Sequence, residues 1–153
     1  MDLFRIYLEE LWSWNRKFNL TGLEDRGRMV VELFLDSLLP SPFVPGEGDL
    51  LDVGSGAGFP GLPLKIHCPL RHTFLLEPNS KKVSFLRHVI RLTKLRGVET
   101  IKGRVERLPQ EVRYDTVTAR ALAELGKTLE CCAPLVRQGG LLVLYLGARA
   151  EEH

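Results

Sequence analysis

The chain has 153 residues, of which 44% are apolar and 26% are charged, and its formal net charge is +2. This length and balance are typical of one globular domain with a single buried core. A net charge so close to zero does not by itself indicate a nucleic-acid-binding protein, so such evidence must come from local clusters of charge.

Membrane, secreted and metal-binding classes are also disfavoured. No apolar stretch approaches the ~20 residues of a membrane span, and we see no basic leader followed by an apolar region and a cleavage site. The three cysteines form no C-x-x-C pair and no zinc-ligand spacing with histidine. We therefore expect no metal site, no disulfide scaffold, and a reduced, cytoplasmic protein.

Two helices are predicted at the start of the chain. Apolar residues recur every three or four positions in residues 3–18, and a second helix is expected at about residues 28–39. The proline-rich stretch at residues 40–45 ends this pattern. We expect residues 1–45 to form a helical prefix and residues 46–153 a second segment, within one compact unit.

Short apolar runs then alternate with helical patterns. The predicted strands cover residues 49–53, 73–77, 100–102, 116–118 and 141–146, and the predicted helices cover residues 61–67, 81–96 and 121–136. Asn79 or Ser80 is expected to cap the helix that Gly97 ends. This alternation predicts an α/β fold, a parallel sheet flanked by helices with right-handed crossovers. Because the chain stops soon after the last predicted strand, we expect a truncated chain or disorder beyond it.

The most informative segment is a glycine-rich turn between a strand and a helix, LLDVGSGAGFPG at residues 50–61. Glycines let a backbone turn sharply and approach a ligand closely. A Walker loop is excluded because Leu62 and Pro63 stand where Lys and Ser or Thr are required. A hydrolase nucleophile at Ser55 is disfavoured because Val53 replaces the first glycine of that motif. A tight turn that binds no ligand is one alternative to a cofactor-binding loop.

Two cofactor classes fit the loop. Gly56, Gly58 and Gly61 match the dinucleotide pattern, which favours NAD. Asp52 precedes the loop, and a carboxylate there would repel a pyrophosphate but attract the ammonium and sulfonium of S-adenosylmethionine. Glu77 ends the next predicted strand, where its carboxylate can accept ribose hydroxyls of either cofactor. The two carboxylates together favour S-adenosylmethionine.

Six motifs, in this order and over nearly the whole chain, resemble the RsmG/GidB family of bacterial 16S ribosomal RNA guanine-N7 methyltransferases. They are W-N-x-x-x-N-L-T at residues 14–21, L-D-S at 35–37, the extended glycine loop at 51–64, K-[RK]-V-x-F-L at 81–86, R-[VA]-E at 104–106 and the S/A-R-A motif at 118–121. The resemblance implies a Rossmann-like class I S-adenosylmethionine-dependent methyltransferase fold, with C-terminal strands that this chain lacks, and a role in rRNA methylation.

The loop, the two carboxylates and the resemblance together give the predicted cofactor-binding residues. These are Asp52, Gly54, Ser55, Gly56, Gly58, Phe59, Glu77, Val105, Glu106 and Arg120. By resemblance, Gly54 and Phe59 line the site, Val105 and Glu106 reach the adenine end, and Arg120 lies at the mouth near the methyl donor. An arginine paired with a surface carboxylate is the alternative for Arg120.

The expected chemistry needs orientation more than proton transfer. Guanine N7 has a lone pair and no proton, so its methylation requires no general base, and Arg120 is the candidate orienting residue. The target base is expected to leave its stack. Asn19, Lys81, Arg87 and Arg91 are the predicted RNA contacts. A helix cap for Asn19 and a solvated helix face for the three cations are the alternatives.

Two positions depart from the family pattern, which often has histidine at Leu33 and usually lysine at Leu146. A degenerate, non-catalytic module that binds S-adenosylmethionine or RNA therefore remains an alternative, and an NAD-dependent oxidoreductase is a second. The expected partner is 16S ribosomal RNA or the small ribosomal subunit, with no membrane and no metal, and the protein is expected to be a monomer.

Overall fold

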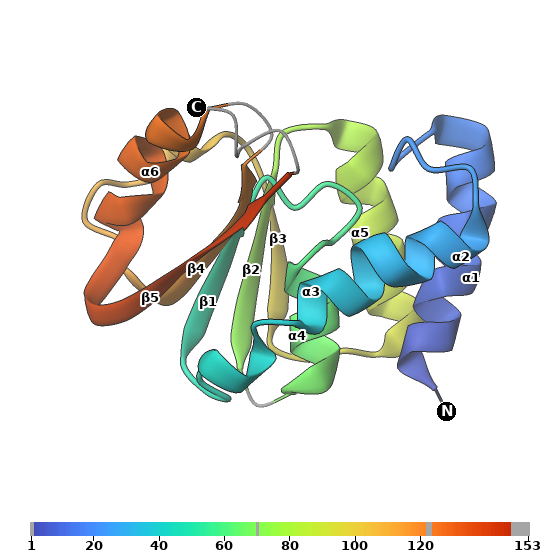
Figure 1. The fold of residues 1–153 in the computed structure, drawn as a ribbon, viewed down its shortest axis with the longest axis horizontal. Helices are drawn as coiled ribbons and strands as arrows, with labels where there is room; N and C mark the ends of the chain where they lie inside the picture. The colour runs from blue at the N-terminus through green and yellow to red at the C-terminus, as the bar shows by residue number, and fades with distance from the viewer. Residues whose placement is uncertain (1, 70, 122–123, 148–153) are drawn as a thin grey trace.

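The computed structural model describes residues 2–69, 71–121 and 124–147, and its centre is one parallel sheet (Figure 1). Its strands are β1 (Asp49–Val53), β2 (His72–Glu77), β3 (Val98–Lys102), β4 (Tyr114–Ala121) and β5 (Val136–Leu146). They lie in the order β3-β2-β1-β4-β5. The predicted α/β fold is confirmed.

Helices cover both faces of this sheet. In chain order, the helices are α1 (Leu3–Phe18), α2 (Arg26–Met29), the π-helix η1 (Val30–Leu35), α3 (Asp36–Leu38), α4 (Gly61–His67), α5 (Ser80–Thr93) and α6 (Leu125–Cys132). Short 3₁₀ turns are η2 (Ser41–Phe43), η3 (Val105–Arg107) and η4 (Ala133–Leu135). Figure 1 shows α6 on one face and α1 to α5 on the other. No helix within the described ranges is long and apolar enough to cross a membrane.

Most predicted helix bounds are confirmed. Helices α1 and α4 coincide with their predicted ranges, and the predicted second helix is the continuous α2–η1–α3 stretch. Asn79 caps α5 by accepting the N–H of Lys82 at 3.1 Å, as predicted. Helix α5 ends at Thr93, three residues before the predicted end, because Lys94 is left-handed with a φ of 54°.

The predicted helix at residues 121–136 is wrong at both ends. Ala121 belongs to β4, where it is the register partner of Leu146 on β5. At the other end the α-helix stops before Pro134, which has no N–H for helical bonding and lies in a 3₁₀ turn. Val136 already begins β5, which is therefore longer than predicted. Within the part of the chain that the structure describes, β5 is the last strand and an edge of the sheet.

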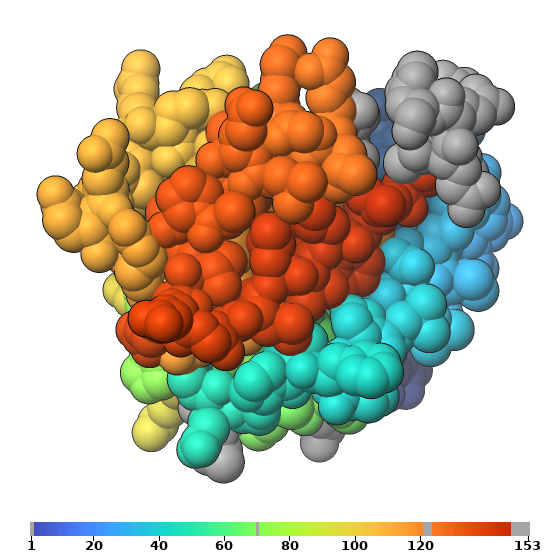
Figure 2. Space-filling view, turned by 60° about the vertical axis from the view of Figure 1, so that its left-hand side comes forward, coloured from blue at the N-terminus to red at the C-terminus, as the bar shows by residue number. Residues whose placement is uncertain are grey.

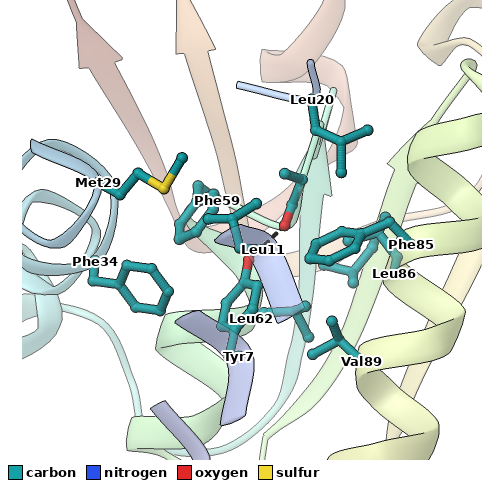
Figure 3. Close-up of a cluster of buried hydrophobic side chains, with 12 residues drawn as sticks. Tyr7, Leu11, Leu20, Met29, Phe34, Phe59, Leu62, Phe85, Leu86 and Val89 are labelled. Atoms are coloured by element: carbon teal, nitrogen blue, oxygen red, sulfur yellow. Dashed lines mark hydrogen bonds between the residues drawn. The ribbon is translucent and has the colours of Figure 1, made fainter. Parts of the chain in front are cut away.

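The helical prefix and the sheet share one buried core. Tyr7 of α1 has no exposed surface, and its ring stacks on Phe59 of the glycine loop at 5.1 Å between ring centroids (Figure 3). Its hydroxyl donates to the carbonyl oxygen of Ala57 at 2.5 Å. Phe34 of η1 packs edge-on against the same Phe59 ring. The division into residues 1–45 and 46–153 stays a prediction, and this core joins the two segments.

We expect Tyr7→Phe to lower the free energy of unfolding by about 1–3 kcal/mol, because the buried carbonyl of Ala57 loses its donor. Urea unfolding measures this change. Tyr114→Phe is the matched control, since the Tyr114 ring is also buried but its hydroxyl has no hydrogen-bond partner among the described residues. Equal losses in the two variants would contradict the account.

Candidate functional site

The glycine loop lies at the carboxyl ends of the strands, between β1 and α4. Strand β1 is flanked by β2 on one side and by β4 on the other, so the strand order reverses beside it. In open α/β sheets, ligands bind at this edge and at this point of reversal. The fold therefore places the loop where a cofactor is expected.

Three glycines of the loop adopt left-handed conformations, but they face different surroundings. Gly54, Gly56 and Gly58 have φ angles of 69°, 58° and 107°. A Cβ atom added at Gly54 or Gly56 would meet nothing within 4 Å, whereas one at Gly58 would collide with the Tyr7 hydroxyl and with Leu62. Gly54 and Gly56 thus leave room for a ligand, while Gly58 lets α1 approach the loop.

Asp52 lies beneath the loop. Its carboxylate has no exposed surface, accepts the hydroxyl of Thr118 on β4 at 2.8 Å, and accepts the N–H of Gly61 at 3.1 Å. Burial raises the pKa of Asp52 to about 6, although its hydrogen bonds oppose this shift. Asp52 therefore ties β1 to β4 and to the start of α4, and both carboxylate oxygens are bound within the protein.

Glu77 holds the other side of the loop. Only 6% of its surface is exposed, and its two carboxylate oxygens accept the N–H groups of Gly56 at 2.9 Å and Asn79 at 2.7 Å. A carboxylate has about four lone-pair sites, so Glu77 retains capacity to accept hydroxyl groups. This carboxylate joins the glycine loop to the start of α5.

Most N–H groups of the loop bind acceptors within the protein. The N–H of Ser55 donates to the carbonyl oxygen of Leu76, and those of Gly58 and Phe59 both donate to the carbonyl oxygen of Ser55. The N–H of Gly56 donates to Glu77, and that of Gly61 donates to Asp52. A phosphate-binding loop instead directs its N–H groups at the ligand. The loop is therefore poorly suited to a pyrophosphate, and its two carboxylates favour a ligand with positive charge.

The structure divides the predicted cofactor residues by depth. Gly54 is exposed and Gly56 is half-buried, so these two lie on the open side of the loop. Ser55 and Phe59 are only 2% and 4% exposed. Ser55 bonds the Asp52 carbonyl through its hydroxyl, and Phe59 lies in the aromatic core. Asp52, Ser55, Gly58 and Phe59 thus shape the loop from below.

The predicted adenine end follows β3. Gly103 donates its N–H to the carbonyl oxygen of Glu77 at 3.2 Å, which brings the start of this segment beside the carboxylate. Val105 is half-buried and packs against the buried cluster that includes Val117 of β4 and Cys132 of α6. Glu106 is exposed on η3.

Arg120 at the end of β4 is held by the helical prefix. Its guanidinium donates to Asp36 at 2.9 Å and to the Ser37 hydroxyl at 3.0 Å, and it lies 4.8 Å from the centre of the Tyr145 ring. The Tyr145 hydroxyl donates to the Ser37 carbonyl at 2.8 Å. Two predicted motifs, L-D-S and S/A-R-A, therefore meet in space. Sequence reasoning missed Tyr145, whose only signal is its pairing with Arg120 in the sheet register.

The predicted RNA contacts belong to other elements than those that hold Arg120: Asn19 follows α1, and the three cations lie on α5. Asn19 ends α1 with a φ of 48° and accepts the N–H of Gly22 at 3.1 Å, as expected of a helix cap.

Of the two departures from the family pattern, Leu33 packs against the core and Leu146 is 52% exposed at the end of β5. No group of side chains suited to a metal ion occurs among the described residues.

The three predicted RNA-binding cations of α5 are all exposed. The ammonium of Lys81 lies 5.2 Å from the centre of the Phe18 ring. Arg87 donates to the Thr100 hydroxyl on β3 at 3.0 Å, and Arg91 lies 3.2 Å from a ring nitrogen of His88. These contacts leave the positive charge of each side chain without a carboxylate partner among the described residues.

Comparison with known proteins identifies a family and relatives over nearly the full chain. The GidB family model, described as rRNA small subunit methyltransferase G, matches residues 1–153. Ribosomal RNA small subunit methyltransferase G of Chloroflexus aggregans is 45% identical over 92% of this chain and 61% of its own length. The protein of that name from Alkaliphilus metalliredigens is 39% identical over 95% of this chain and 64% of its own length. The chain thus spans less than two thirds of these curated relatives.

The fold also has solved counterparts. Coclaurine N-methyltransferase bound to N-methylheliamine and SAH aligns with a TM-score of 0.63 at 16% identity, over 72% of this chain and 34% of that chain. At this identity the likeness concerns the fold, and it confirms the expected methyltransferase-type arrangement of sheet and helices.

We expect the buried carboxyl of Asp52 to make stability fall as the pH rises from about 4 to about 6. Its pKa is higher in the folded protein, so the folded state binds the proton more tightly than the unfolded state across this window. A shift from 3.8 to about 6 corresponds to roughly 3 kcal/mol. Urea unfolding of wild type and Asp52→Asn across this range measures the difference in slope.

Glu47→Gln, which changes an exposed carboxylate, is the control and should keep the wild-type slope. An NMR titration of the Asp52 carboxyl in the unchanged protein measures the same property directly. A midpoint near 4 would contradict the assigned environment.

Proposed function

The chain belongs to the GidB family, rRNA small subunit methyltransferase G, and on this premise we propose that it transfers a methyl group from S-adenosylmethionine to N7 of a guanine in 16S ribosomal RNA. The observation that carries the proposal is the glycine loop, most of whose N–H groups are bound to Asp52, Glu77 and backbone carbonyls. Such a loop suits a cofactor that brings positive charge and no phosphate.

The cofactor would lie against the open side of the loop. Gly54 and Gly56 leave space there, and the spare lone pairs of Glu77 can accept the ribose hydroxyls. Asp52 contributes negative charge from beneath the loop, which favours the ammonium and sulfonium groups. We assign the adenine end to Val105 and Glu106. S-adenosylmethionine supplies the electrophilic methyl group.

Arg120 is proposed to orient the reacting groups. Guanine N7 carries a lone pair and no proton, so the protein needs to position it in line with the sulfur–methyl bond and needs no general base. Asp36, Ser37 and the Tyr145 ring fix the guanidinium in one place at the carboxyl edge of the sheet. A fixed cation is better suited to orientation than a mobile one, because it loses less entropy when the substrate binds.

We further propose that Asn19, Lys81, Arg87 and Arg91 contact the RNA, and that the target base leaves its stack. The proposed partner is 16S ribosomal RNA or the small subunit, and we propose a cytoplasmic monomer without a metal. A non-catalytic S-adenosylmethionine-binding module is the second candidate, because the exposed Leu146 replaces a lysine of the family pattern. NAD is disfavoured by the bound N–H groups of the loop.

Methyl transfer from radiolabelled S-adenosylmethionine to 16S ribosomal RNA tests the proposal. We expect transfer by the unchanged chain and a fall of about 10- to 100-fold in kcat for Arg120→Ala, equivalent to roughly 1.4–2.7 kcal/mol of lost orientation. Arg137→Ala is the matched control. Arg137 also lies on a strand, β5, and its guanidinium forms an ion pair with a carboxylate, that of Asp115 at 2.6 Å. Undiminished transfer by Arg120→Ala would remove its assigned role, and binding without transfer by wild type would favour the second candidate.

A further inference from the structure

Positive charge is concentrated in one part of the chain. Residues 80–107 contain nine lysines and arginines but only two glutamates, a net charge of +7. The whole chain has a net charge of +2, which leaves −5 for all other residues. The near-neutral total therefore conceals a strongly basic segment that comprises α5, β3 and η3.

The lysines and arginines of this segment are not neutralised. None forms an ion pair with a carboxylate among the described residues, and all except the half-buried Lys82 are exposed. The cations that do pair, such as Arg28 with Glu32 and Arg137 with Asp115, lie in other segments. Mutual repulsion among unpaired cations opposes folding, so these side chains are expected to serve an anionic partner.

A cavity lies at the end of this segment where β3 leads into η3. It has a volume of about 290 Å³ and is lined by Pro78, Lys102, Gly103, Arg104 and Arg107. Lys102 is the register partner of Glu77, so the cavity opens at the carboxyl ends of β2 and β3. It therefore lies immediately beside the carboxylate proposed to bind the cofactor ribose.

One cation of α5 is linked directly to the strand that leads to this cavity. The hydrogen bond from Arg87 to the Thr100 hydroxyl fixes this guanidinium on β3, the edge strand that leads to Lys102. Arg91 follows Arg87 at a spacing of four residues, which places both on the same side of α5. The exposed cations thus run from α5 over β3 to the cavity.

We propose that this surface binds the backbone of the substrate RNA, with a phosphate in the cavity formed by Lys102, Arg104 and Arg107. The inference rests on the proposed function, which it extends by fixing the side from which the RNA approaches. The positive charges of Lys102, Arg104 and Arg107 suit a phosphate, and a polyanion that reaches the cavity from the β3 edge releases counterions as it binds.

The triple variant Lys102→Gln/Arg104→Gln/Arg107→Gln tests this surface. We measure binding of in vitro transcribed 16S ribosomal RNA by fluorescence anisotropy across a range of salt concentrations. Each lost phosphate contact should reduce the slope of log affinity against log salt by about 0.7–0.9. We expect a reduction of at least one such step, together with unchanged calorimetric affinity for S-adenosylmethionine.

The control variant Arg5→Gln/Arg28→Gln/Lys127→Gln removes three exposed cations from α1, α2 and α6, so its change in net charge is the same. A wild-type slope in the cavity variant, or equal reductions in both variants, would overturn the inference. RNA binding with the expected slope change but without methyl transfer would contradict the proposed function and leave this surface standing. A wild-type chain without affinity for this RNA would overturn the docking surface, while its affinity for S-adenosylmethionine tests the cofactor site separately.

Discussion

Two buried carboxylates, at the ends of adjacent parallel strands, determine the shape of the glycine loop. Asp52 binds the N–H of Gly61 where α4 begins, and Glu77 binds the N–H of Gly56 in the middle of the loop. Parallel pairing of β1 and β2 brings these two side chains to the same edge of the sheet. Negative charge holds the loop in its middle and at its end, so these N–H groups are not directed at a ligand.

Negative and positive charges lie in different parts of the molecule. Negative charge lies beneath and beside the loop, whereas unpaired positive charge lies on the outer surface of α5, β3 and η3. Figure 2 shows the side of the molecule that carries β5 and α6, drawn in red and orange, and η3 contacts α6 on that side. A cationic cofactor and an anionic RNA both fit this separation, because each would meet charge of opposite sign. The helical prefix completes the site through Tyr7 below the loop and through Asp36 and Ser37 at Arg120.

Much of the fold could be predicted from local patterns, because helix caps, apolar periodicity and the glycine loop are properties of neighbouring residues. The depth of a side chain is not local, so the complete burial of Asp52 and Phe59 could not be read from sequence. The partners of Arg120 lie 84 and 83 residues away, and their positions depend on how the prefix packs. The wrongly predicted helix at residues 121–136 begins in β4 because pairing with β5 overrides local propensity.

Calorimetry tests whether Glu77 selects the cofactor. The unchanged chain and Glu77→Gln are titrated with S-adenosylmethionine, and with NAD as the competing cofactor. We expect wild type to bind S-adenosylmethionine and not NAD. We expect Glu77→Gln to weaken this binding about 10- to 100-fold, as for lost hydrogen bonds to a charged group. Glu99→Gln, an exposed carboxylate on β3, should bind as wild type does. Preferential binding of NAD, or equal affinity for S-adenosylmethionine in wild type and Glu77→Gln, would contradict the account.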